Sequence, residues 1–284
     1  AAANTGNYNT AIGTLSMTGN TTGNYNAGIG YNSLSSNTSG SNNTAFGALS
    51  LENNTIGFQN TAIGHFALTS NTTASQNTAV GHLAMGSNIS GSSNVAIGNW
   101  ALEFNQTGVQ NVAVGVESLQ SNTASYNTAT GNRSLYANTS GTNNTANGKD
   151  ALNANTSGNN NTAMGRNTLN LNTTGGNNTA VGIFALESNT TAGNNVAVGY
   201  SANSNTGNFT NCIGLGYDAE PGASNTARIG NSSVSTIGGY AAWSNLSDGR
   251  FKTNVVENVA GLEFIMKLRP VTYNLDMDAL AQFN

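Results

Sequence analysis

Charged side chains are scarce in this sequence, and their scarcity narrows the classes of protein that it can encode. Only 7% of its 284 residues are Asp, Glu, Lys or Arg, whereas soluble domains usually contain about 25%. The formal net charge is −4, which is too small for a disordered chain kept open by charge repulsion. The eight Lys and Arg residues are spread along the chain and form no basic patch, so nucleic acid is not an expected partner.

Long apolar runs and cysteines are also missing or rare. No apolar run approaches the ~18 residues of a membrane span, so insertion into a membrane is not expected. Cys212 is the only cysteine, which excludes a disulfide framework within the chain and clustered thiolates for zinc. We expect it to be a small buried residue. No cofactor is indicated, and the chain consists mostly of Asn, Thr, Ser, Gly and Ala.

Glycine recurs with a period of seventeen residues through most of the chain. The series starts at Gly13, takes one step of sixteen to Gly131 and ends with a step of fourteen at Gly230. Four residues before the glycine stands an asparagine, at positions that include Asn9, Asn26, Asn43, Asn60, Asn77 and Asn94. Four residues after it stands a leucine or methionine, at positions that include Leu34, Leu51, Leu68, Leu102, Leu119 and Leu135. A period kept in several columns at once is typical of a solenoid.

One repeat is predicted to contain two short strands and a turn. The segment Asn-Thr-Ala-Ile-Gly is alternating and rich in β-branched residues, which predicts a strand. A second short strand is expected in the segment that ends in Ala-Leu, with its leucine turned inward. The segment Asn-Thr-Thr/Ser-Gly tolerates positive φ and predicts a tight turn. Seventeen residues are too few for a βαβ unit, but they suit one coil of a parallel β-solenoid.

Stacked coils place identical side chains in ladders, with leucines inside and asparagines at the corners. Two residues before the glycine stands Ala or Gly, from Ala11 to Gly214. This small residue points either into the coil or towards a close contact with another chain. The next residue is usually large and apolar, as in Ile12, Phe46 and Val80, and one coil can cover only one of the two sets. Oligomerisation is therefore expected, although these residues alone do not specify three-fold symmetry.

The Asn-Thr-Ala-Ile-Gly…Ala-Leu unit resembles the head repeats of YadA-like trimeric autotransporter adhesins over about residues 7–233. The resemblance implies an all-β fold, a left-handed parallel β-roll, a homotrimer and a surface-adhesive role. The period of seventeen is longer than is usual in that family, and Thr130 and Asn147 interrupt the apolar column. We assign residues 1–233 to the solenoid head or shaft and 234–246 to a connector.

Composition changes after about residue 235, and residues 218–284 contain twelve of the charged side chains and both prolines. The run that begins at Ser247, Ser-Asp-Gly-Arg-Phe-Lys-Thr-Asn, is followed by Gly-Leu and Leu-Arg-Pro-Val-Thr-Tyr. It resembles the start of the C-terminal intramolecular chaperone of phage endosialidase tailspikes and related tail fibres. We assign 247–284 to the start of this module, truncated, and expect a short helix over 256–268.

The chaperone resemblance implies a single act of self-cleavage. Ser247 would be the nucleophile, Lys252 the base, and the bond between Leu246 and Ser247 the one that is cut. A serine becomes nucleophilic when a nearby lysine loses its charge by burial and accepts the proton. No external substrate is expected.

The leading function is an extracellular fibre, structural and receptor-binding or adhesive, of tail-fibre or surface-adhesin type. Its expected partners are copies of itself and a cell-surface glycan or protein, and its expected location is a cell surface, a virion or an injection device. A glycan-cleaving enzyme is disfavoured, because the few carboxylates of residues 1–200 are not paired at glycosidase spacing; they are Glu52, Glu103, Glu117, Asp150 and Glu187.

An ice-binding solenoid is the alternative. A column of Thr or Val that could organise water lies three residues before the repeat glycine, at Thr10, Thr44, Thr61, Thr78, Val95, Val112, Thr128, Thr145, Thr162 and Thr179.

Two further features favour a structural interpretation. His65 and His82 share a column without a third ligand column beside them, which indicates exposed ladder residues and no metal site. Several aromatic residues follow the repeat glycine by one or two positions, and scattered surface or edge packing is favoured for them over a sugar-binding stripe; they are Phe66, Trp100, Phe184 and Tyr200.

Overall fold

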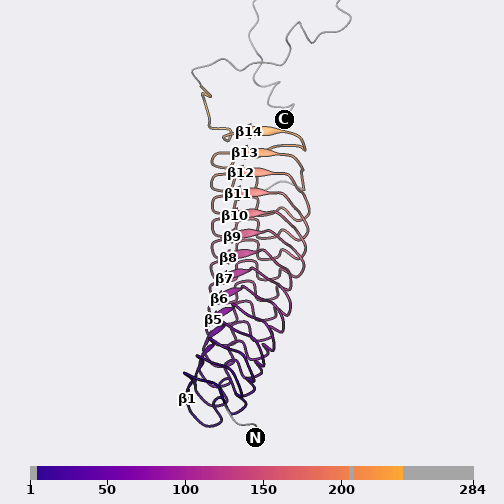
Figure 1. The fold of residues 1–284 in the computed structure, drawn as a ribbon. Helices are drawn as coiled ribbons and strands as arrows, with labels where there is room; N and C mark the ends of the chain where they lie inside the picture. Colours follow the sequence, from indigo (N-terminus) through magenta and orange to yellow (C-terminus); the bar gives the residue numbers. More distant parts are fainter. Residues whose placement is uncertain (1–4, 205–207, 239–284) are drawn as a thin grey trace, which may run out of the picture. The chain divides into compact units, whose positions relative to one another are not determined.

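The computed structural model describes residues 5–204 and 208–238, which form one parallel sheet of fourteen short strands (Figure 1). The strands stack in chain order, each hydrogen-bonded to the next, and no helix occurs among these residues. The strands are β1 (Thr10–Ile12), β2 (Ala27–Ile29), β3 (Thr44–Phe46), β4 (Thr61–Ile63), β5 (Thr78–Val80), β6 (Val95–Ile97), β7 (Val112–Val114), β8 (Thr128–Thr130), β9 (Thr145–Asn147), β10 (Thr162–Met164), β11 (Thr179–Val181), β12 (Val196–Val198), β13 (Ile213–Leu215) and β14 (Ala227–Ile229).

The pairing register follows the sequence period. Thr44 of β3 pairs with Thr61 of β4, seventeen residues later. Val112 of β7 pairs with Thr128 of β8, sixteen residues later, so the short step removes a residue from the connection and leaves the pairing intact. Because each strand pairs with its counterpart one coil on, residues 5–204 and 208–238 form an all-β parallel solenoid, as the sequence predicted.

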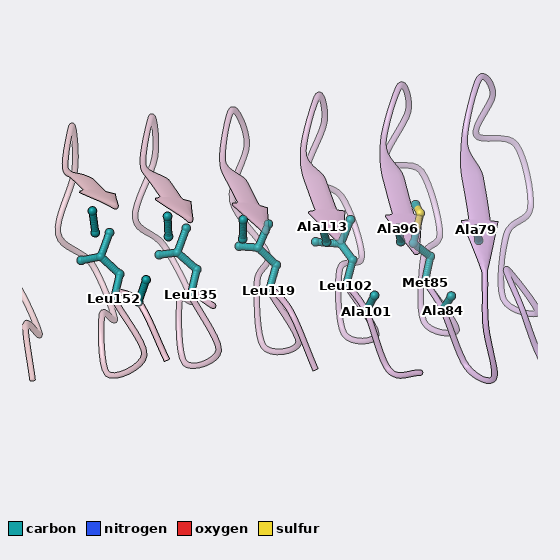
Figure 2. Packing of buried hydrophobic residues seen from close by; sticks show 14 of the residues in the cluster. Ala79, Ala84, Met85, Ala96, Ala101, Leu102, Ala113, Leu119, Leu135 and Leu152 are labelled. Carbon is teal, nitrogen blue, oxygen red and sulfur yellow. The ribbon is translucent and has the colours of Figure 1, made fainter. Parts of the chain in front are cut away.

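Each coil adds one large apolar side chain to a continuous core. Leu102, Leu119 and Leu135 are fully buried, and so are Ala96 and Ala113 in the strands. Figure 2 shows the leucines recurring once per coil, with their side chains directed towards the strand that carries the alanines. The small residue of each strand therefore points into the coil, which decides between the two positions that the sequence left open. Burial of each leucine contributes ~1.5–3 kcal/mol.

The segment that ends in Ala-Leu is a turn, so the predicted second strand is wrong. Trp100 and Leu102 both have positive φ, 56° and 54°. The segment still bonds to both neighbouring coils, because the Leu102 amide donates to the Ser118 carbonyl at 2.9 Å and the Trp100 amide to the His82 carbonyl at 3.0 Å. Alternating side chains correctly indicated the inward direction of the leucine, but they carry no information about the sign of φ.

The connection between repeats bends without the positive φ that its composition predicted. None of Asn37 to Gly40 is in the positive-φ region. The Asn37 Nδ2 instead donates to the Gly40 carbonyl at 2.9 Å and closes the bend with a side chain. Positive φ occurs two residues later, at Asn42 (φ 60°), and at the equivalent position of the other coils.

This positive-φ position offers a stabilising substitution. Gln110 occupies it with φ 55° and an exposed side chain, and asparagine tolerates the left-handed region better than glutamine does. We expect Gln110→Asn to raise the free energy of unfolding by ~0.5–1 kcal/mol in denaturant titrations. Gln106→Asn is the control, because Gln106 is exposed without positive φ. An equal gain in both variants would contradict the explanation.

Candidate interaction surfaces

Any chemistry of the solenoid must take place on its surface. Among the described residues no pocket opens, and no three His, Cys, Asp or Glu side chains lie close enough to hold a metal ion. Within the same ranges, no helix is long and apolar enough to cross a membrane. Ser247, Lys252, the bond after Leu246 and the helix predicted over 256–268 lie outside the described residues, as does the connector beyond residue 238.

Buried asparagines bind successive coils together at one corner. The Asn94 amide donates to Asn77 Oδ1 at 3.0 Å, Asn94 Nδ2 donates to the Gly108 carbonyl at 2.9 Å, and the Asn111 amide donates to Asn94 Oδ1 at 2.8 Å. The same pattern of amide to Oδ1 links Asn9, Asn26, Asn43, Asn60 and Asn77. A satisfied buried network of this kind makes a protein rigid, so its role here is structural.

A second column of asparagines runs parallel to the first. Asn88 Nδ2 donates to Asn71 Oδ1 at 2.9 Å and to the Gly91 carbonyl at 3.0 Å. Cys212 stands in the first column, where the other coils have asparagine, and is fully buried with its thiol free, as the sequence predicted. Its amide still donates to Asn195 Oδ1 at 2.9 Å. The column of asparagine side chains therefore ends at Asn195, while the backbone of Cys212 keeps its bond to the preceding coil.

The first and third residues of the strands face outward, and we call their two columns the outer sheet face. In β6, Val95 is half-buried, Ala96 is buried and Ile97 is 41% exposed. The apolar third residues that lie exposed are Ile12, Phe46, Ile63, Ile97, Val114, Met164, Val181, Val198 and Ile229. With ~4.8 Å between strands, this apolar strip is ~60 Å long, interrupted by the polar Thr130 and Asn147. Monomers seldom expose so continuous an apolar surface.

Threonines form the other column of the outer sheet face. Thr44, Thr61 and Thr78 are directly paired neighbours in β3, β4 and β5. A second run of paired threonines extends from Thr128 in β8 to Thr179 in β11. These side chains are exposed or half-buried, so the face carries a threonine column beside the apolar one.

The two positions after each repeat glycine form a further surface, which we call the corner row. His65 and Phe66 have ring centroids 4.0 Å apart, His65 and His82 stack at 5.6 Å, and His82 meets Trp100 edge-on at 5.9 Å. The two histidines lie one coil apart in the same column, as the sequence predicted, with His65 exposed and His82 half-buried. The aromatic rings, however, are grouped along the row and not scattered.

A second aromatic group lies five coils further along the corner row. Phe184 and Tyr200 meet edge-on with centroids 5.7 Å apart, and Tyr200 stacks on Tyr217 at 5.7 Å. The Arg166 guanidinium carbon lies 5.1 Å from the centre of the Phe184 ring. The sequence interpretation singled out Phe184 and Tyr200 but missed Arg166 and Tyr217. Reading the two columns together, for aromatic and cationic residues alike, would have found all four.

Charged side chains fill the corner row between the two aromatic groups. Arg133 Nε lies 3.5 Å from Glu117 Oε2, and Lys149 Nζ lies 2.9 Å from Asp150 Oδ2. Arg166 follows in the next coil, and within residues 5–204 and 208–238 it has no carboxylate partner. Arg166 therefore stands without an ion pair at one end of the second aromatic group, and Asp218, the residue after Tyr217, is within the same ranges a carboxylate without an ion pair at the other end.

Residues 247–282 match the family model described as chaperone of endosialidase. The match agrees with the resemblance found for the C-terminal segment and covers that segment alone. Searches of the curated proteins and of the solved structures returned no match. The similarity of the solenoid to YadA-like head repeats therefore stays a prediction.

Proposed function

We propose that this chain is a subunit of an extracellular fibre of tail-fibre or surface-adhesin type, with a cell-surface glycan or protein as its receptor. The solenoids associate as a homotrimer, and the C-terminal segment guides their assembly. The observation that carries the proposal is the apolar column of the outer sheet face, which lies exposed in the single chain from Ile12 to Ile229.

Covering this column supplies a driving force for association. Apolar surface that is removed from water contributes ~25 cal/mol per Å² to the free energy of association. Every coil of the solenoid adds to this surface. Because the column is in register, identical chains related by rotation about an axis along the solenoid can repeat the same contact at each level. Three copies is the number that the resemblance to YadA-like head repeats implies.

A dedicated assembly segment suits a fibre of this kind. Unassembled chains would present long apolar strips together with unpaired strand edges, and both promote aggregation during slow parallel pairing. The match of residues 247–282 to a family described as chaperone of endosialidase supports such a role for the segment. Once the chains are aligned, Ser247 with Lys252 as its base releases the segment by cutting the bond after Leu246.

Native mass spectrometry of the full chain, read beside the denatured subunit mass, tests the proposal. We expect a native mass three times that of the subunit, with subunits that end at Leu246. In the Ser247→Ala variant we expect the subunits to remain uncut.

Ile97→Asp places a charge on the apolar column, and we expect it to lower the trimer fraction at least tenfold, since an unpaired buried charge costs several kcal/mol. Ile89 is also exposed but lies outside the strands, so Ile89→Asp is the matched control.

The outcomes separate assembly from cleavage. A monomeric wild-type chain would refute the fibre, and an uncut trimer would retain the fibre and refute the self-cleavage. A trimer that tolerates Ile97→Asp as well as Ile89→Asp would show that another surface holds the chains together.

The outer sheet face also supports the second candidate, an ice-binding solenoid. Its threonine column is regular in β3 to β5 and again in β8 to β11. A face covered by other subunits is not available to ice, so the two functions exclude each other. A monomer with measurable thermal hysteresis would favour ice binding, and a trimer without it would remove this candidate.

A further inference from the structure

We infer that the second aromatic group of the corner row, together with its arginine, binds an extended glycan that carries carboxylate groups. The proposed site consists of Arg166, Phe184, Tyr200 and Tyr217. The inference deepens the proposed function, on which it rests, by assigning the receptor-binding site of the fibre and the chemical class of its ligand.

The four side chains form an unbroken series along the solenoid. They come from four successive coils, and each contacts the next: cation over ring at 5.1 Å, ring edge to ring face at 5.7 Å, and ring stacked on ring at 5.7 Å. Tyr200 is 49% exposed and Tyr217 63% exposed. An aromatic series that remains this accessible leaves ring surface and hydroxyl groups free to meet a ligand.

The chemistry of the series fits sugars with acidic groups. The apolar C–H faces of sugar rings pack on aromatic rings, and the tyrosine hydroxyls can donate to or accept from sugar hydroxyls. The Arg166 guanidinium carbon lies over the Phe184 ring, and the residue is exposed, so its N–H donors can reach a ligand. Those donors match a carboxylate in a two-bond arrangement. Since Arg166 lacks an acidic partner within the described ranges, the ligand supplies the negative charge.

The spacing of the coils favours a polymer over a small ligand. Successive coils are ~4.8 Å apart, which is close to the advance of one sugar ring in an extended glycan chain. A glycan lying along the corner row would therefore meet one side chain of the series at each ring.

The other occupant to consider is a second copy of this chain. The apolar column of the outer sheet face already offers the larger surface for such a contact, whereas the series is short and confined to one end of the solenoid. A ligand of opposite charge is the better complement.

Titration calorimetry of the full chain against short oligogalacturonates and hyaluronan oligosaccharides tests the inference. Fully methyl-esterified oligogalacturonate is the uncharged comparison. We expect the acidic probes to bind, the ester to bind at least tenfold more weakly, and the affinity for the acids to fall with added salt. Arg166→Gln and Tyr200→Ala are each expected to lower the affinity about tenfold or more.

Matched controls lie elsewhere on the same molecule. Tyr8 and Tyr25 also stack, at 4.8 Å, without an arginine against their rings, so Tyr8→Ala should leave binding unchanged. Arg228 is an exposed arginine of β14 outside the corner row, and Arg228→Gln should do the same. Circular dichroism before titration shows that each variant is folded.

The native mass of every sample separates this inference from the proposed function. Trimers that bind neither acid, or bind both equally well after Arg166→Gln, would overturn the site and leave the fibre standing. A monomer that binds the acids through Arg166 would support the site and refute the trimer. Loss of the trimer on Arg166→Gln would assign the series to a contact between subunits and overturn its role as a glycan site.

Discussion

Gly81→Ala is expected to lower the free energy of unfolding by ~3–5 kcal/mol, because both the backbone and the space at this position reject a side chain. Gly81 has φ +135°, where residues with a Cβ are rarely found. A Cβ built there would lie 2.5 Å from the Gly98 carbonyl oxygen and 2.6 Å from its carbon. These atoms belong to the backbone of the next coil, so they have no flexible side chain to move aside.

The neighbouring coil cannot retreat without losing its own bonds. The Gly81 amide donates to the Ile63 carbonyl at 2.8 Å and the Gly98 amide to the Val80 carbonyl at 2.8 Å. Because coils contact mainly their neighbours, a break in the middle divides the solenoid into two shorter arrays, and each is less stable than the whole.

Thermal and denaturant unfolding followed by circular dichroism measure this effect, with Gly222→Ala as the control. Gly222 is exposed, has no positive φ, and a Cβ there would meet nothing within 4 Å. We expect the control to change stability by less than ~0.5 kcal/mol. Equal losses at Gly81 and Gly222 would mean that the close approach of the coils does not explain the repeated glycine.

The sequence predicts those features of the fold that recur at equivalent positions of successive repeats. A column of one residue type shows which side chains share an environment, so the inward Leu102 and the position of Asn94 at a corner were predictable, whereas the outward direction of Ile97 was left open. The sign of φ is a property of the backbone, and alternating side chains predicted a strand at Trp100 to Leu102 where the structure has a turn. That error arose because the sign of φ alternates along Trp100 to Leu102. Such a turn places successive side chains on opposite sides, as a strand does.

The corner row was harder to predict because its residues vary from coil to coil. Buried positions carry the same residue type in every repeat because each coil needs the same packing. A surface that contacts a ligand needs different side chains in different coils. Arg166 and Tyr217 carry no signal of their own in the sequence, because neither belongs to a column that repeats one residue type. Their contacts with Phe184 and Tyr200 become evident only when coils are stacked in register.

Asn94→Ala is expected to lower the free energy of unfolding by ~2–6 kcal/mol. Its side chain is fully buried, and its removal leaves the Asn111 amide without its acceptor at 2.8 Å. The Gly108 carbonyl loses one of its two donors and keeps the bond from Asn105 Nδ2 at 3.0 Å. Each buried group left unsatisfied costs ~1–3 kcal/mol, and the cavity adds to the loss. The variant also interrupts the ladder between two coils, so denaturant unfolding should become less cooperative as well as occur earlier.

Asn53→Ala isolates the contribution of burial to this loss. Asn53 is an exposed asparagine whose Nδ2 donates to the Thr69 carbonyl at 2.9 Å, so the substitution removes a bond that water can replace. We expect a change of ~0.5 kcal/mol or less. If the two variants unfolded at the same denaturant concentration, the buried ladder would contribute no more than a surface hydrogen bond. The asparagines would then recur for another reason, such as the shape of the bend, and Asn94→Asp, which retains the shape but not the Nδ2 donor, would be as stable as the wild type.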